Sequence, residues 1–82
     1  MKTIRFEPNV PAEIRAIDRA TAMTILEAIH LYAQTGQGRV KPLQGEFTGF
    51  LRPRAGNHRV FFEETEQVIT IHRVRDRKDA YK

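Results

Sequence analysis

The stretch GFLRPRAGNHRVFFEE, residues 49–64, decides what kind of sheet this chain can form. Apolar and polar residues alternate on both sides of the glycine–asparagine pair at 56–57, which is the period of strands with one buried face. Glycine and asparagine accept a positive φ, so this pair predicts a two-residue hairpin loop. Arg52, Arg54 and Arg59 lie on the two strands that the loop would join, so the hairpin carries a dense positive charge.

The positions of the loops set the register of the strands and therefore the two faces of the sheet. A loop at 56–57 places Arg54 opposite Arg59, and a second loop at 65–66 places Phe62 opposite Ile69. The aliphatic residues then collect on one side, where helices can cover them. This predicted core face carries Leu51, Val60, Phe62, Ile69 and Ile71.

The opposite face of the predicted sheet gathers positive charge. Like charges directly opposite each other on adjacent strands destabilise a sheet, and a bound anion would remove this repulsion. We interpret the face as a phosphate-binding surface; the alternative is a solvated face that binds nothing. It would carry Arg52, Arg54, Arg59 and His72, with Phe50, Phe61, Val68 and Val74 toward its ends.

The first half of the chain predicts a short strand followed by helix. Residues 2–6 alternate in polarity, and Pro11 suits the first turn of a helix. Apolar residues then recur at helical spacing until Gly36, with a break near residues 18–21. This pattern indicates two helices or one bent helix.

The succession of elements predicts the fold class. Strands at about 48–54, 58–63 and 67–74 complete the order β-α-α-β-β-β. That order is typical of an α+β domain in which helices cover one face of an antiparallel sheet. We therefore expect one domain over residues 1–82, with about four antiparallel strands and two N-terminal helices packed on one face.

Composition limits the kind of protein further. The chain has 82 residues, no cysteine and a net charge of +4, all of which arises from residues 39–82. Without cysteine there is neither a disulfide framework nor a thiolate metal site, and the three histidines lie on different predicted elements. We expect no metal and no cofactor. We also find no signal peptide and no run of the roughly 18 apolar residues that span a membrane, so we expect a cytoplasmic protein without a membrane partner.

Two segments of the second half resemble the RelE/ParE superfamily of bacterial toxins from type II toxin–antitoxin modules. The resemblance is carried by a Leu-x-Gly, a strand with Arg-x-Arg, a His-Arg pair after the loop, and a terminal Arg-Lys-Asp-x-Tyr. It implies a RelE-like fold and a cognate antitoxin with an acidic, partly disordered segment. It also implies that operator DNA is bound only by the toxin–antitoxin complex. The segments are LQGEFTGFLRPRAGNHRVFFEETEQVITIHRV, residues 43–74, and RKDAY, residues 77–81.

The resemblance also implies a target. RelE-type members are mRNA interferases that cleave messenger RNA on the ribosome, whereas ParE-type members share the fold and inhibit DNA gyrase. The predicted function is therefore a ribosome-dependent, metal-independent endoribonuclease toxin. A gyrase inhibitor, or an inactive member that only binds antitoxin or nucleic acid, is the alternative. By resemblance to the RelE-type site, the functional residues are Arg52 in place of a lysine, Arg54, Arg59, Arg77 and Tyr81.

Metal-free RNA cleavage assigns tasks to these residues. The 2′-hydroxyl must lose a proton, the phosphorane must be stabilised, and the leaving oxygen must be protonated. Arg54 and Arg59 would stabilise the phosphorane, and Arg77 would act as acid or phosphate clamp. Tyr81 would stack on a base. His72 would be the base, because imidazole exchanges protons near neutral pH. The alternative is that His72 is a structural strand residue and that Arg52 raises local hydroxide activity instead.

The sequence departs from the RelE-type pattern at three places. Phe50 stands where a lysine is expected, and His58 stands where a tyrosine is common. Arg75-Asp76 replaces a frequent Gly-His. Phe50 and Arg75-Asp76 keep the inactive alternative open, whereas a gyrase inhibitor is expected to have a non-basic sheet face, which this sequence does not show.

Overall fold

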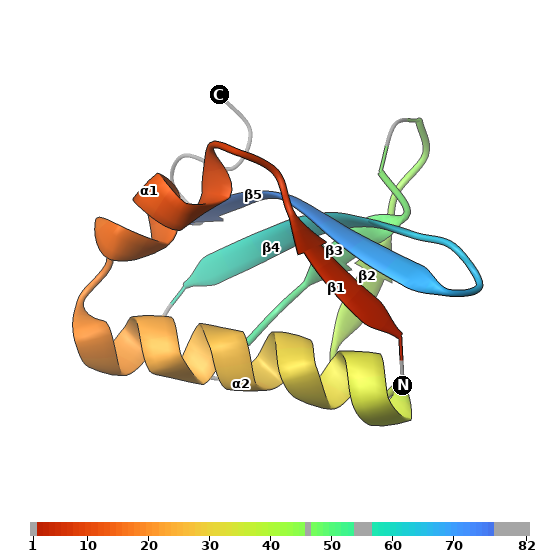
Figure 1. Cartoon of the computed structure of the whole chain (residues 1–82), viewed down its shortest axis with the longest axis horizontal. Coiled ribbons are helices and arrows are strands. Elements are labelled where there is room, and N and C mark those ends of the chain that lie inside the picture. The colour runs from red at the N-terminus through yellow and green to blue at the C-terminus, as the bar shows by residue number, and fades with distance from the viewer. Residues whose placement is uncertain (1, 46, 54–56, 77–82) are drawn as a thin grey trace.

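A computed structural model describes residues 2–45, 47–53 and 57–76 of the chain (Figure 1). The sheet lies on the two helices as a second layer, with α2 running along its lower side (Figure 1). No helix in these ranges is long and apolar enough to cross a membrane. The elements in chain order are β1 (Thr3–Phe6), α1 (Val10–Arg15), α2 (Arg19–Thr35), β2 (Val40–Pro42), β3 (Gly49–Leu51), β4 (His58–Glu64) and β5 (Val68–Asp76).

The helix boundaries follow from local residue chemistry, as the sequence predicted. Pro11 lies in the first turn of α1, where its missing N–H leaves no bond unmade. Asp18 caps α2, because its side chain accepts a hydrogen bond from the Thr21 N–H at 3.0 Å. At the other end Gly36 takes a left-handed conformation, with φ of 76°, and donates its N–H to Tyr32 O.

The sheet has five strands in the order β1-β5-β4-β3-β2, so two details of the prediction were wrong. The short strand β2 was not predicted. It pairs antiparallel with β3, with Val40 opposite Leu51. The first strand lies parallel to β5, with Phe6 beside Ile71, although an antiparallel sheet was predicted. No hairpin turn joins β1 to β5, so no local connection requires the two strands to be antiparallel.

The predicted β3–β4 register was wrong by two residues, and the predicted β4–β5 register was wrong by two from Phe62 to Glu64 and by three from His58 to Phe61. The structure pairs Leu51 with Val60, whereas the predicted loop would have paired Leu51 with Phe62. It also pairs Phe62 with Ile71 in place of Ile69. A shift of two preserves the side to which each residue points, so the predicted core face is confirmed.

A β-bulge in β5 changes one further assignment. Phe61 pairs with Arg73 and Phe62 pairs with Ile71, which leaves His72 as an extra residue in β5. His72 and Arg73 therefore both lie on the side away from the helices. Val74, predicted on that side, belongs instead to the core and is only 4% exposed.

The main core lies between the helices and the sheet. Apolar residues of α2 repeat every three or four positions and face the predicted aliphatic side of β3, β4 and β5. Burial of these side chains is the principal force that joins the two layers. The buried members are Val10, Ile25, Ile29, Ala33, Leu51, Val60, Phe62, Ile69, Ile71 and Val74.

A polar network ties the start of the chain to the core layers. Glu64 at the end of β4 accepts hydrogen bonds from Lys2 Nζ and from the Tyr32 hydroxyl, both at 2.5 Å. Burial and the hydrogen bond to this carboxylate raise the pKa of Tyr32 to about 12. Burial alone would raise the pKa of Glu64, but the two hydrogen bonds and the charge of Lys2 lower it overall.

Candidate functional site

The candidate site is the sheet face that points away from α1 and α2, here called the outer face. Side chains of its strands line up in rows across the sheet, because cross-strand partners point to the same side. One row runs through Lys41, Phe50, Phe61 and Arg73, each paired with the next. This row has a cation at each end and two phenyl rings in the middle.

A second row consists of four arginines. Arg59 on β4 pairs directly with Arg75 on β5. Arg52 directly follows the last paired residue of β3 and so stands beside Arg59, while its N–H donates to Arg39 O at 2.8 Å. We call Arg39, Arg52, Arg59 and Arg75 the arginine row.

Aromatic rings form a small second core under these cations. Phe50 and Phe61 are 1% and 4% exposed, and their ring centroids are 5.5 Å apart. Leu43 and Phe47, from the connection between β2 and β3, pack against them. The outer face is therefore not an open polar surface, and the phenyl rings predicted at its ends lie near its centre.

The guanidinium groups lie over these rings. Arg59 Cζ is 4.6 Å from the centroid of Phe50. Arg73 Cζ is 5.2 Å from the Phe47 centroid and 5.8 Å from that of Phe61. Cation–π contacts of this kind stabilise a charge and restrict its direction, so they position Arg59 and Arg73 on the outer face.

His72 lies between two carboxylates on the same face. Its Nε2 is 3.1 Å from Glu63 Oε1, and its Nδ1 is 3.7 Å from Glu7 Oε1. The Nε2 atom is buried, and its approach to Glu63 lacks the alignment of a hydrogen bond. The Phe47 ring covers the imidazole, with centroids 5.1 Å apart. The acidic neighbours Glu7 and Glu63 were not foreseen from the sequence.

Helix α1 holds the bulged end of β5 in place. Asn9 Nδ2 donates to His72 O at 3.0 Å, and Glu13 Oε1 accepts from the Val74 N–H at 2.8 Å. Glu13 Oε2 also contacts Arg75 Nη1 at 2.7 Å. Burial by itself would raise the pKa of Glu13, but the hydrogen bonds from Arg75, Val74 and Asn9 lower it overall. These contacts fix one end of the arginine row.

The structure describes only some of the predicted site residues. Arg59 and His72 lie on the outer face, and Arg52 is exposed beside Arg59. The sequence did not point to Lys41 on β2 or to Arg39 directly before it, because that three-residue strand was not predicted. Arg54, Arg77 and Tyr81 lie outside the described residues.

The arrangement can bind anions more readily than metals. The described residues contain no cluster of three or more histidine or acidic side chains that could hold a metal ion. Arginine offers paired N–H donors that match the oxygens of a phosphate or carboxylate. Arg59 pairs with Arg75 across β4 and β5, and the Glu13 carboxylate already offsets the charge of Arg75.

Several solved toxins share this fold. The RelBE2 toxin–antitoxin complex of Mycobacterium tuberculosis matches with a TM-score of 0.71 at 22% identity, over 93% of this chain and 98% of that chain. The DinJ–YafQ complex of E. coli matches with a TM-score of 0.77 at 9% identity, over 99% and 98%. The chromosomal ParDE system of P. aeruginosa matches with a TM-score of 0.70 at 18% identity, over 93% and 96%.

The family itself is given by sequence. No curated protein sequence matches the chain significantly. A family model described as the ParE toxin of the type II toxin–antitoxin system parDE matches residues 4–81, nearly the whole chain. The resemblance in the arginine-rich second half is thereby confirmed. The chain belongs to the ParE toxin family of type II toxin–antitoxin systems, within the RelE/ParE superfamily.

Proposed function

We propose that this type II toxin is a ribosome-dependent endoribonuclease that cleaves messenger RNA without a metal. The observation that supports it is the arginine row, in which Arg75 and Arg59 pair across β5 and β4 and continue to Arg52 and Arg39 at the ends of β3 and β2. Strands are about 4.8 Å apart, so the row extends over about 14 Å, which is long enough to contact more than one phosphate of an RNA strand. A gyrase inhibitor without catalysis is expected to have a non-basic sheet face instead.

Arginine accounts for one part of the proposed reaction. The phosphorane carries additional negative charge, and fixed guanidinium groups stabilise such charge in proportion to how well they are positioned. Arg59, which is held over the Phe50 ring, fits this task, and Arg54 is its proposed neighbour in it. Arg77 is proposed as acid or phosphate clamp and Tyr81 as the stacking platform.

A proton acceptor for the 2′-hydroxyl is the second requirement of the proposed reaction. His72 is proposed as the base, but both of its ring nitrogens face carboxylates. Glu63 lies 3.1 Å from Nε2, so this carboxylate would have to move when RNA binds for Nε2 to accept the proton. If Glu63 stays in place, Arg52 would promote the attack instead by raising local hydroxide activity.

Induction of the toxin without its antitoxin tests the proposal directly. Primer extension should show breaks within translated codons of messenger RNA, and Arg59→Ala should reduce them at least tenfold, because one positioned charge is lost. Arg19→Ala, an exposed arginine at the start of α2, is the matched control and should cleave like the wild type. Equal cleavage by Arg59→Ala and the wild type would contradict the role of the arginine row.

A second candidate target is DNA gyrase, as the resemblance implies for the ParE branch. Two observations favour it: the family model that matches is the ParE toxin, and the centre of the outer face is aromatic. Growth arrest with intact messages and accumulated gyrase-linked DNA breaks would support this candidate and refute the ribonuclease. Growth without arrest would support the inactive alternative.

A further inference from the structure

The connection between β2 and β3 places an aromatic ring on the outer face. It rises from the sheet on the side away from α2 (Figure 1), and its Phe47 packs against Phe61 with ring centroids 5.7 Å apart. The same ring lies 5.1 Å from the imidazole of His72. Phe47 is half-buried, whereas Phe50 and Phe61 of the same cluster are 1% and 4% exposed. Phe47 is therefore the phenyl ring of this cluster that a planar ligand can reach.

A guanidinium group extends this surface. Arg73 Cζ lies over the Phe47 ring, 5.2 Å from its centroid. Within the described ranges Arg73 has no acidic ion-pair partner, whereas Arg75 pairs with Glu13. A phenyl ring and a guanidinium plane are both groups on which unpaired nucleobases stack. We call Phe47 and Arg73 the stacking surface.

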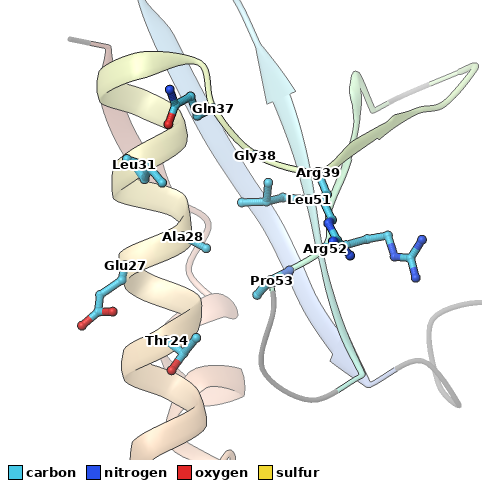
Figure 2. A pocket seen from close by; sticks show the side chains of 10 residues that line it. All are labelled: Thr24, Glu27, Ala28, Leu31, Gln37, Gly38, Arg39, Leu51, Arg52 and Pro53. Carbon is cyan, nitrogen blue, oxygen red and sulfur yellow. The ribbon is translucent and has the colours of Figure 1, made fainter.

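The stacking surface lies one row away from the arginine row. Arg73 precedes Arg75 by two residues on β5, and Phe61 follows Arg59 by two residues on β4. Two residues of a strand extend about 7 Å, which is comparable to the reach of one nucleotide from its phosphate to its base. Further along the arginine row, the Arg52 side chain extends away from α2 (Figure 2). A strand whose phosphates follow this row can thus place a base on the stacking surface.

We propose that the stacking surface binds one nucleobase of a single-stranded RNA whose phosphates contact the arginine row. This inference rests on the proposed function and adds a base-binding subsite to the phosphate contacts. Stacking on a ring tolerates all four bases, because each of them has a π face. The subsite therefore positions the strand and does not select its sequence.

The chemistry of the surface favours a single strand over a duplex and binding over packing alone. Bases in a duplex stack on one another, whereas an unpaired base is free to stack on a protein ring. An aliphatic side chain can cover the buried rings equally well, as Leu43 does from the same connection. Phe47→Leu consequently separates the two roles, because it keeps apolar packing and removes the ring.

The test measures how the purified full-length toxin binds a short 2′-O-methyl oligoadenylate. This strand cannot be cleaved, because its methylated 2′-oxygens cannot attack the phosphates. A strand of equal length without bases carries the same phosphates and reports the contribution of charge alone. The wild type should bind the oligoadenylate at least about fivefold more tightly than the abasic strand. Phe47→Leu should abolish this preference, and Phe47→Tyr should retain it.

Tryptophan fluorescence gives a second, independent measurement. The chain has no tryptophan, so Phe47→Trp introduces a single indole, whose emission a stacked base quenches. Phe6→Trp is the matched control, because Phe6 is 43% exposed and lines a hollow between β1 and α2. Saturating oligoadenylate should quench the emission of Phe47→Trp and leave that of Phe6→Trp unchanged.

Three results would overturn the proposal. The first is a wild type that binds both strands equally or binds neither, and the second is a Phe47→Leu variant, folded by circular dichroism, that keeps the preference. The third is Phe47→Trp without quenching at saturation, which decides the matter if Phe47→Leu does not fold. Because the test strand cannot be cleaved, failure here is separate from failure of the proposed ribonuclease, which intact messages in primer extension would show.

Discussion

Glu13 offers the sharpest test of how α1 supports the outer face. Its carboxylate accepts the Val74 N–H at 2.8 Å and contacts Arg75 at 2.7 Å, and its side chain is only 16% exposed. Strand β1 pairs with β5 only as far as Ile71. Beyond that residue, Glu13 accepts the hydrogen bond of the Val74 N–H on this edge of β5. Glu13→Ala would remove both interactions, together with an exposed hydrogen bond from Asn9 Nδ2 at 2.7 Å, and would release one end of the arginine row.

The size of the effect follows from the hydrogen bond and the ion pair that this substitution removes. An amide N–H left without a partner in a partly buried site costs about 1–2 kcal/mol, and a partly exposed ion pair adds at most about 1 kcal/mol. We therefore expect Glu13→Ala to lower the free energy of unfolding by about 2 kcal/mol. In a chain of this size that corresponds to a fall in melting temperature of about 8–16 °C.

Urea unfolding followed by circular dichroism measures this change in stability. Because the pKa of Glu13 is lowered in the folded state, its contribution is present above the ordinary carboxyl range and is lost as pH falls through the folded pKa. The difference between wild type and Glu13→Ala should therefore shrink in acid. Glu66→Ala, an exposed residue near the β4–β5 turn, is the control. A destabilisation under about 0.5 kcal/mol at neutral pH, typical of ordinary surface changes, would refute the reasoning.

Two further predictions concern the two cores. Phe61→Ala should lower the free energy of unfolding by about 3–4 kcal/mol in urea melts, because a buried ring is removed; a cost near zero would mean that the aromatic cluster is not packed. Tyr32→Phe should remove the tyrosine that titrates near pH 12 in ultraviolet absorbance. Since the raised pKa favours the neutral phenol in the folded state, wild-type stability from this group should persist up to about pH 10 and be lost toward pH 12. The chain has two tyrosines, so a wild type in which both titrate in the ordinary range would contradict the Glu64 contact.

The candidate site was only partly predictable from the sequence. Alternation along the chain correctly placed Arg59 on the face opposite Leu51, because side chains in a strand point to the two sides in turn. It could not reveal that Phe47 reaches across to His72, since the connection before β3 has no period from which its direction follows. The carboxylates that flank His72 come from β4 and from the residue after β1, two strands that meet only through β5.

Features that depend on neighbouring residues could be derived from the amino-acid order alone. Asp18 and Gly36 mark the two ends of α2 through local hydrogen bonds and backbone conformation. The period-two pattern identified the core face of the sheet. That assignment survived a register error of two residues because the period of a strand is two. Local chemistry therefore specified the elements and their apolar sides.

The contacts between strands and helices, by contrast, are determined by packing in three dimensions. The parallel pairing of β1 with β5 and the added strand β2 depend on residues far apart in the chain. The bulge at His72 moved Val74 into the core, because burying an aliphatic side chain outweighs one irregular position in the ladder. Strand pairing and the position of the bulge depend on how the whole sheet buries its apolar face against the helices. No single stretch of the sequence specifies this packing.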